Sequence, residues 1–383
     1  MVKTPQKEKV SESLDVLIVS DYPSPHLVDF FDALNRHPGL RIKIMFTEAE
    51  NPLRKWGKHE GTFPSERIQA KYVSIGRYRL KFSFQFLKRI LADRSDLLVF
   101  FDAFFQPTTI CAAFWLKMKK RKWGIFTEPL FERNRNKLTL EIQKVLFRLL
   151  RKAFVIFTTG TRAVSKWRDL LGSAIHIENL PYYRRLEGFY DASLTNKKRD
   201  NNLGVRFLYC GQLIPIKRVD ILVKCAMQLI KEGYRFELYL VGSGPIYDEL
   251  RGMVTPEAET KIHFVGDVRY EDMAAQYAQK DVFVFPSCDD GWGMVVMEAL
   301  AAGLPVISTY GVSSAVDFIR DGNNGFIVEP NTVEPFLEKM KFFLNNPEQI
   351  PVFSASASRI REEYSPDIGA EKFYHVVRKL CLP

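Results

Sequence analysis

A glycine-bearing loop that runs directly into a helix is the segment of this sequence with the clearest chemical consequence. Gly291 and Gly293 let the backbone approach a ligand closely, and the apolar run after them predicts a helix over residues 294–302 that stops at Gly303. The start of such a helix aims unpaired N–H groups and the positive end of the helix dipole at the loop. The segment therefore predicts a site for an anion such as a diphosphate.

Two carboxylates bracket this helix start. Glu298 lies about one turn into the predicted helix, where it can accept hydrogen bonds from two neighbouring ribose hydroxyls. Asp290 precedes the helix and can accept hydrogen bonds from the hydroxyls of a bound hexose. The alternative is that Asp290 caps the helix and Glu298 is an ordinary surface residue, because acidic groups near a helix start are stabilising without a ligand.

The whole string over residues 285–307 resembles the signature of the retaining glycosyltransferases of family four. In that signature Glu-x7-Glu stands beside Gly-Phe-Gly and is followed by Glu-Ala-x-Ala-x-Gly-x-Pro-Val, whereas this chain has Asp290 for the first glutamate and Trp292 for the phenylalanine. The resemblance implies catalytic roles for Asp290 and Glu298. It also implies a donor-binding loop made of Gly291, Trp292, Gly293, Met294 and Val295.

A second segment, residues 209–220, resembles the family's Gly-Arg-Leu…Lys-Gly-Val-Asp loop, in which the arginine and the lysine bind the donor's phosphates. Lys217 matches the lysine, but Gln212 stands where arginine is usual. The resemblance thus implies that Lys217 carries most of the charge stabilisation of a departing diphosphate. Taken alone, Lys217 and Arg218 would be only an exposed basic pair. A third match, which ends at Val268, lies where the family holds the nucleotide base.

The first half of the chain is less informative. His26 follows the first predicted strand, Asp102 follows the third, and Glu128 ends the fourth. These are places where related enzymes face the donor or the acceptor, so the three residues are candidates for the acceptor side. A single loop histidine is more often incidental than functional.

Short runs rich in Val, Ile and Phe alternate with amphipathic stretches, which is the pattern of strand-helix units in a parallel sheet. We expect strands in the first half at residues 14–20, 41–46, 96–101, 123–127, 154–159 and 175–180. In the second half we expect them at residues 205–211, 236–242, 261–266, 281–287, 305–310 and 325–328. The sequence therefore predicts an α/β protein, and the resemblance implies the GT-B fold, with two Rossmann-like domains that face each other across a cleft.

The expected domains follow from where this pattern stops. We expect one domain over residues 1–190, a polar linker over residues 191–204 and a second domain over residues 205–365. The resemblance implies that the first domain binds the acceptor and the second binds the nucleotide sugar. Residues 366–383, which begin after Ser365, form a helix that packs back on the first domain.

Composition narrows the class of protein. The chain has 383 residues, 46% of them hydrophobic and 26% charged, which is typical of folded domains. Its five cysteines are scattered, which indicates reduced thiols. No apolar run resembles a signal peptide or a membrane span. We therefore expect a cytoplasmic protein, either free or peripheral at the inner face of the cell membrane.

A formal net charge of +10 favours an anionic partner, which is a nucleic acid, a nucleotide or a membrane surface. Basic and aromatic residues interleave in Arg77–Leu91 and Phe114–Trp123, which suggests docking on an anionic membrane. The alternative is a solvated helix face over a core. No nucleic-acid-binding module occurs, and a nucleic-acid partner is not expected.

The resemblance, taken with these observations, implies a retaining, metal-independent hexosyltransferase that moves a sugar from a nucleotide sugar to a glycan or lipid-linked acceptor in cell-envelope polysaccharide or lipopolysaccharide synthesis. No Asp-x-Asp triplet offers metal ligands, so we expect no metal, and no cofactor besides the nucleotide-sugar substrate. The alternatives are a sugar-nucleotide-binding protein with a degenerate donor site and a nucleotide-sugar epimerase on the same fold.

Overall fold

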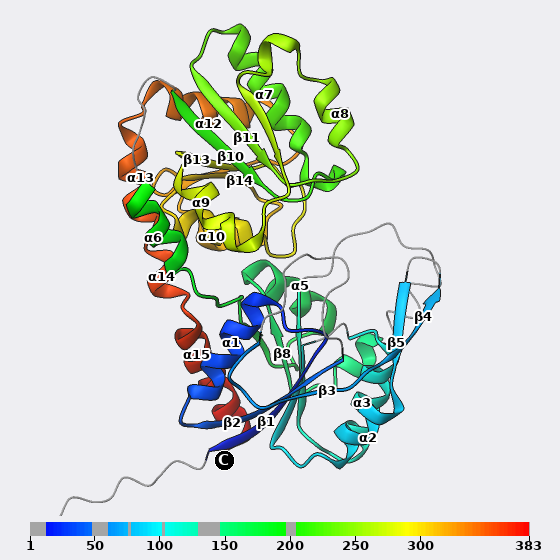
Figure 1. Ribbon diagram of the computed structural model, residues 1–383. Coiled ribbons are helices and arrows are strands. Elements are labelled where there is room, and N and C mark those ends of the chain that lie inside the picture. The colour runs from blue at the N-terminus through cyan, green and yellow to red at the C-terminus, as the bar shows by residue number, and fades with distance from the viewer. Residues whose placement is uncertain are drawn as a thin grey trace, which may run out of the picture.

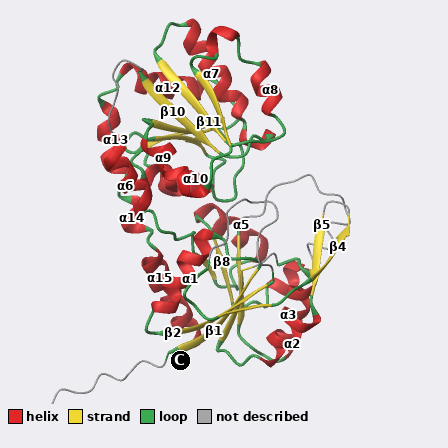
Figure 2. Ribbon diagram, in the orientation of Figure 1, coloured by secondary structure: helices red, strands yellow, loops and turns green. Residues whose placement is uncertain are grey.

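Two parallel β-sheets, each covered by helices, form the framework of the protein (Figures 1 and 2). The computed structural model describes residues 13–47, 60–75, 78–101, 104–128, 146–196 and 204–382. Every strand expected from the sequence is present, with bounds that differ by at most two residues. The prediction succeeds because most of these strands are short buried runs of apolar residues that end at a turn.

The first sheet has the strand order β3-β2-β1-β6-β7-β8-β9. Its strands are β1 (Leu14–Ser20), β2 (Leu40–Phe46), β3 (Ser65–Arg67), β6 (Leu97–Phe101), β7 (Trp123–Thr127), β8 (Val155–Thr158) and β9 (Ile177–Asn179). The helices of this domain are α1 (Pro25–Arg36), α2 (Phe84–Ala92), α3 (Pro107–Met118) and α5 (Thr161–Leu171). All its strand pairings are parallel, as in a doubly wound domain.

The second sheet has the strand order β12-β11-β10-β13-β14-β15. Its strands are β10 (Val205–Cys210), β11 (Phe236–Val241), β12 (Ile262–Gly266), β13 (Val282–Phe285), β14 (Val306–Thr309) and β15 (Gly325–Val328). Its helices are α7 (Val219–Lys231), α8 (Tyr247–Gly252), α9 (Met273–Ala278), α10 (Met294–Ala301), α11 (Ser313–Phe318), α12 (Glu334–Asn345), α13 (Gln349–Ala357) and α14 (Ile360–Glu363). The order 3-2-1-4-5-6 is that of a Rossmann domain.

The last helix, α15 (Pro366–Cys381), leaves the second domain and packs on the first (Figure 1). Ser365 caps it by accepting a hydrogen bond from the amide of Ile368. Phe373 is fully buried in the first domain's core, and Arg36 forms an ion pair with Asp367 at 2.6 Å. Burial of the apolar side of α15 holds this helix against α1.

Residues 187–196 differ from the expectation, which divided them between the first domain and a linker. They form a helix, α6 (Glu187–Asn196), and Phe189 is buried in the core of the second domain with its ring 5.5 Å from that of Tyr277. The apolar spacing is weak there because the helix buries few of its side chains.

An antiparallel hairpin of β4 (Lys71–Ile75) and β5 (Tyr78–Phe82) was also not anticipated. Its sequence mixes basic and aromatic residues, which conceals the alternation of a strand. The hairpin precedes α2, and the side chain of its Lys81 reaches the carboxyl edge of the first sheet.

Candidate functional site

The site predicted from the glycine loop lies where the strand order of the second sheet reverses. β10 has β11 on one side and β13 on the other, so the loops after β10 and β13 leave the carboxyl edge in opposite directions. Ligands of doubly wound sheets bind in the crevice between such loops. The first loop carries a short 3-10 turn, Pro215–Lys217, and the second carries residues 286–293.

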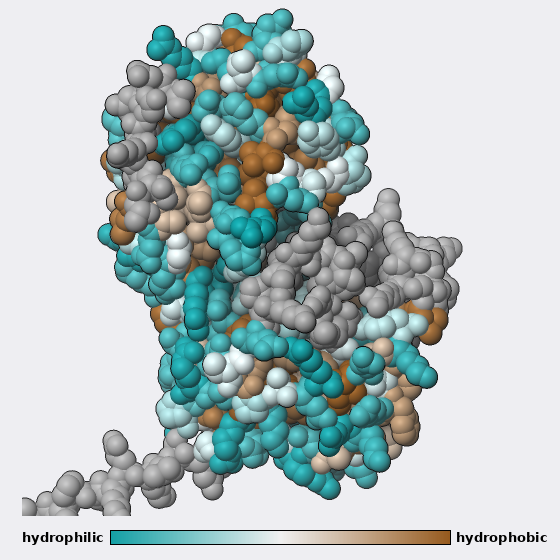
Figure 3. All heavy atoms as spheres, viewed as in Figure 1, coloured by the Kyte–Doolittle hydropathy of each residue, from teal (hydrophilic) through white to brown (hydrophobic). Residues whose placement is uncertain are grey.

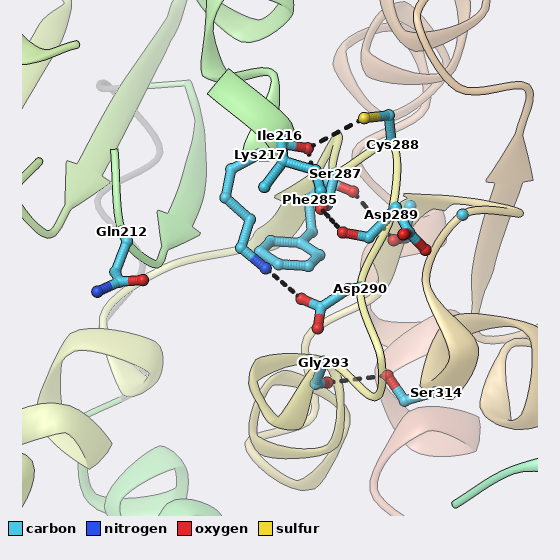
Figure 4. Close-up of polar contacts among 12 residues, drawn as sticks. Gln212, Ile216, Lys217, Phe285, Ser287, Cys288, Asp289, Asp290, Gly293 and Ser314 are labelled. Carbon is cyan, nitrogen blue, oxygen red and sulfur yellow. Dashed lines mark hydrogen bonds and ion pairs between the residues drawn. The ribbon is translucent and has the colours of Figure 1, made fainter. Parts of the chain in front are cut away.

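Backbone hydrogen bonds join these two loops. The carbonyl of Ile216 accepts from the amide of Cys288 at 3.0 Å. It also accepts from the hydroxyl of Ser287 at 3.2 Å and from the thiol of Cys288 (Figure 4). The amide of Asp290 donates to the carbonyl of Gly311 at 3.0 Å, so the loop after β14 supports the second loop. The positions of Lys217 and Asp290 are therefore set by backbone contacts.

Lys217 and Asp290 form an ion pair across the crevice (Figure 4). Their side chains are 16% and 17% exposed, and the lysine nitrogen lies 5.2 Å from the centre of the Phe285 ring. Partial burial on an aromatic face strengthens the pair relative to a surface contact. The structure thus brings together two residues that the sequence selected from separate motifs.

Helix α10 begins immediately beyond this pair. Its N-cap, Gly293, has a φ of 88°, and a Cβ there would lie 2.7 Å from a methyl carbon of Val312. Ser314 donates to the carbonyl of Gly293 at 2.8 Å (Figure 4). Among the described residues no side chain caps α10, and the Asp290 carboxylate is engaged by Lys217. The alternative role of Asp290 as a cap for this helix is therefore not supported.

Glu298 is buried, with 8% of its surface exposed, so the alternative of an ordinary surface residue is wrong. One carboxylate oxygen forms an ion pair with Arg184, and the other accepts from the Tyr277 hydroxyl at 2.8 Å. Arg184 is itself 4% exposed and also donates to the Tyr270 hydroxyl. Burial lowers the pKa of Arg184, but the nearby charge of Glu298 raises it further, so its net pKa is above the ordinary value.

The remaining donor-side residues lie at the same edge in different settings. Gln212 is exposed, and its side chain points away from the Lys217–Asp290 pair (Figure 4). Trp292 is 2% exposed, and its ring packs edge-to-face on Phe318. Its side chain therefore lies in the core, and only its backbone lines the loop. Val268 is half-buried beyond the end of β12. Gly291 is buried, and Met294 and Val295 are half-buried at the start of α10.

Two of the three acceptor-side candidates lie together in the first domain. The His26 ring lies 4.6 Å from the Tyr182 ring, and the Tyr182 hydroxyl donates to Glu128 at 2.9 Å. Burial raises the pKa of Tyr182 well above its ordinary value, so this phenol stays protonated. Asp102 lies outside the described residues.

Contacts between the domains surround the donor loop. The Asp317 carboxylate of α11 accepts from the backbone amide of Thr161 at 3.1 Å, at the first residue of α5. Arg162 donates to the carbonyl of Gly311 at 2.7 Å, and this carbonyl also accepts from the amide of Asp290. Thr161 follows β8 and Gly311 follows β14, so the carboxyl edges of the two sheets face each other.

Sequence reasoning missed the residues that couple the site to the rest of the chain. Arg184 and Arg162 are single basic residues without a distinctive spacing, and Tyr270 and Tyr277 resemble ordinary helix residues. Their roles depend on contacts between elements far apart in the sequence. Within the described residues, no group of three or more His, Cys, Asp or Glu side chains is arranged to hold a metal ion.

Comparison with known proteins agrees with this geometry. Residues 204–346 match the model of the glycosyl transferases group 1 family. An uncharacterized glycosyltransferase of Methanocaldococcus jannaschii is 29% identical over 181 residues, which cover 47% of this chain and 48% of that protein. A GDP-mannose-dependent monoacylated alpha-(1-6)-phosphatidylinositol monomannoside mannosyltransferase of Corynebacterium glutamicum is 27% identical over 56% of this chain and 59% of its own length. The chain spans about half the length of the curated relatives that it matches.

Solved structures resemble the chain over nearly its whole length. Anabaena Alr3699/HepE in complex with UDP superposes with a TM-score of 0.74 at 15% identity, over 96% of this chain and all of that one. Sucrose-phosphate synthase from Thermosynechococcus elongatus gives a TM-score of 0.72 at 17% identity, over 96% of this chain and 99% of that one. The architecture is therefore GT-B, which confirms the expected fold.

The match to the glycosyl transferases group 1 model, residues 204–346, lies in the second domain, which carries the Lys217–Asp290 pair.

Proposed function

We propose that the protein is a retaining glycosyltransferase that transfers a hexose from a nucleotide sugar to a hydroxyl of a glycan or lipid-linked acceptor. The observation that carries the proposal is the Lys217–Asp290 pair beside the start of α10, at the switch point of a group 1 domain. A cation and backbone N–H groups directed at one place stabilise a departing diphosphate. Retention of the anomeric configuration is proposed from the resemblance of residues 285–307 to the family's signature.

In this proposal Lys217 and Asp290 bind different parts of the donor. Lys217 and the first amides of α10 stabilise the charge that develops on the diphosphate as the bond to the sugar breaks. Asp290 accepts hydrogen bonds from the hydroxyls of the transferred sugar. The opposite charges of the two side chains neutralise each other, which offsets the cost of partly burying each of them.

Glu298 is the proposed acceptor of hydrogen bonds from the donor ribose. Arg184 and Tyr277 each occupy one of its oxygens, but a carboxylate offers about four acceptor positions, so a ribose hydroxyl can still bind it. The Nε of Arg184 is buried beside Glu298 and has no hydrogen-bond partner in the described part of the chain.

The acceptor side of the proposed site is formed by the first domain. His26, Tyr182 and Glu128 form one polar group there, and Asp102 remains a candidate that follows β6. His26 or Glu128 is suited to hold the attacking hydroxyl in position, because both carry hydrogen-bond acceptors. We propose no metal and no cofactor apart from the nucleotide sugar.

A role in cell-envelope glycan synthesis is proposed from the relatives. They include a mannosyltransferase acting on a phosphatidylinositol mannoside, a poly(ribitol-phosphate) alpha-N-acetylglucosaminyltransferase of Staphylococcus aureus and a capsular polysaccharide glycosyltransferase. We therefore propose that the protein acts at the inner face of the cell membrane. No helix within the described residues is long and apolar enough to span a membrane.

A donor-binding protein with a degenerate site is the second candidate, because Gln212 replaces a cationic residue and is turned away from the pair (Figure 4). A nucleotide-sugar epimerase is the third. Thermal unfolding in the presence of UDP, GDP, ADP and TDP sugars will identify the donor, since a ligand that binds only the folded state raises the Tm.

The stabilising donor is then incubated with the enzyme and candidate acceptors. A transferase releases the nucleoside diphosphate and glycosylates the acceptor, a degenerate binding protein releases nothing, and an epimerase yields an isomeric nucleotide sugar. If none of these sugars raises the Tm, the donor-site proposal is wrong.

A further inference from the structure

Helix α3 is apolar on both of its sides. Its inner side buries Ala112, Ala113 and Leu116, whereas its outer side exposes Phe114 by 55% and Met118 by 67%. Surface helices of a soluble domain ordinarily carry polar residues on the outer side. Large exposed side chains at a spacing of four residues therefore indicate that this side of α3 contacts something apolar.

The β4–β5 hairpin exposes apolar residues next to α3. In the pairing register Lys71 lies opposite Phe82, and Val73 opposite Leu80, so these four side chains share one face. Val73 is 60% exposed and Phe82 is 44% exposed. The hairpin is attached to the start of α3, because the amide of Lys81 donates to the side chain of Gln106 at 2.9 Å.

Two more exposed aromatic residues lie on the segments next to the hairpin and α3. Phe84 begins α2 and is 73% exposed, and Phe105, just before α3, is 43% exposed. We call this surface the apolar face, and it consists of Val73, Phe82, Phe84, Phe105, Phe114 and Met118. In Figure 3, brown and tan atoms gather on the part of the first domain that carries β5, α2 and α3. Exposed apolar surface of this kind marks an interaction site.

Lysines border the apolar face. The exposed ones are Lys71 on the hairpin, Lys88 on α2, and Lys117, Lys119 and Lys120 at the end of α3. Lysine is depleted at protein–protein interfaces, whereas lysine beside exposed aromatic residues is typical of proteins that lie on anionic bilayers. The charge on the apolar face therefore favours a lipid surface over a protein partner.

The hairpin also connects the apolar face to the acceptor side of the cleft. Lys81 points inward, is 2% exposed, forms an ion pair with Asp21 and donates to the Thr47 hydroxyl at 3.0 Å. Asp21 and Thr47 follow β1 and β2, at the carboxyl edge of the first sheet. Phe82, the next residue in the chain, faces outward. One strand thus separates the apolar face from the edge where an acceptor would bind.

We propose that the apolar face docks on an anionic lipid bilayer, with its aromatic side chains in the interface and its lysines on the headgroups. This position would present an acceptor that is anchored in the same bilayer to the carboxyl edge of the first sheet. The presentation of an acceptor rests on the proposed transferase function, whereas the docking itself does not.

The test measures sedimentation of the full chain with vesicles of phosphatidylcholine alone and with vesicles that also contain about 30% phosphatidylglycerol. We expect binding to the anionic vesicles that weakens between about 50 mM and about 500 mM salt. The double variant Phe114→Glu with Met118→Glu should bind at least about tenfold more weakly, because it puts two negative charges on the apolar face. Both side chains are exposed, so the variant should fold, which thermal unfolding will verify.

Val352→Glu is the matched control. Val352 is 60% exposed on α13 of the second domain, and its replacement should leave vesicle binding unchanged. Failure of the wild-type chain to bind anionic vesicles would overturn the proposal, as would equal binding by the double variant. If the wild-type chain dimerises and the double variant is monomeric, the apolar face is a contact between copies and the proposal is also wrong.

A Lys217→Ala variant distinguishes this proposal from the proposed function. It should lose donor turnover and retain vesicle binding, because Lys217 lies in the second domain, away from the apolar face. Intact donor turnover without vesicle binding would reject only the docking proposal. Vesicle binding without donor turnover in the wild-type chain would reject only the transferase.

Discussion

Arg184, in the segment that joins the two domains, is paired with Glu298 on the helix that begins at the donor loop. Both residues are buried, with 4% of Arg184 and 8% of Glu298 exposed, and Tyr270 and Tyr277 provide the neighbouring hydrogen bonds. The interdomain connection is therefore attached directly to the proposed ribose-binding residue. A change at either residue affects the stability of the protein as well as its donor site.

The first prediction concerns this pair. Glu298→Gln should lower the free energy of unfolding by about 3 kcal/mol, because the buried guanidinium of Arg184 loses its counter-charge. Arg184→Met should also destabilise the protein, and the double variant should cost less than the sum of the two single changes, with a coupling of about 1–3 kcal/mol. Chemical unfolding of the four proteins measures this coupling. If the two losses of unfolding free energy are additive, the interaction between Glu298 and Arg184 does not stabilise the protein.

The second prediction concerns Lys217. Lys217→Ala should reduce turnover of the identified donor about 100-fold or more, because the neighbouring cation, Arg218, is already bonded to Asp220 and Asn331. The control is Lys224→Ala, an exposed lysine on α7 that pairs with Asp220, and it should turn over normally. Normal turnover by Lys217→Ala would place the phosphate site elsewhere.

Gln212 allows the complementary experiment. It is exposed, so Gln212→Arg should change the free energy of unfolding by less than about 0.5 kcal/mol. Because it restores the arginine usual in the family, it should maintain or raise the donor affinity. A clear loss of affinity in donor titrations would mean that the glutamine has its own role in this protein.

Asp317 provides a test of the contact between the domains. Its carboxylate caps the first turn of α5 from the other domain, so Asp317→Ala should cost about 1 kcal/mol of stability and loosen the domain contact. Thermal unfolding measures the first effect, and small-angle scattering measures the second as a larger radius of gyration. Asp248→Ala, at an exposed first turn within the second domain, should leave the radius unchanged.

Asp29 leads to a prediction about pH. Burial raises the pKa of its carboxyl above the ordinary value of 3.8, although the Arg185 amide and the charges of Arg184 and Arg185 partly oppose this. The folded protein therefore binds the proton more tightly than the unfolded chain, so stability falls as the pH rises from 3.8 through the raised pKa.

Asp29→Asn cannot ionise and keeps an oxygen for the Arg185 amide, so it should avoid this loss. At neutral pH we expect its Tm to exceed that of the wild type by less than about 4 °C, and we expect the difference to vanish in acid. Melting curves across the acid range test this, and a lower Tm of the variant at pH 7 would contradict it.

The sequence by itself determined the strands of the two sheets other than β3, the two-domain α/β architecture and the glycine loop before α10. These features depend on local patterns: buried Val, Ile and Phe runs bounded by turn residues make the strands, and a glycine such as Gly293 is required where the backbone adopts a positive φ in a crowded turn. The basic and aromatic pattern of Phe114–Trp123 likewise indicated a surface of unusual composition.

Only the tertiary structure decided how these parts act on one another. It buried Trp292, turned Gln212 away from Lys217, and paired Arg184 with Glu298. It also folded Tyr78–Phe82 into strand β5 and Phe84–Ala92 into helix α2, and it placed both beside α3. Such relations depend on the packing of elements that are far apart in the chain. Local propensity carries no information about which distant side chain will fill a given space or neutralise a given charge.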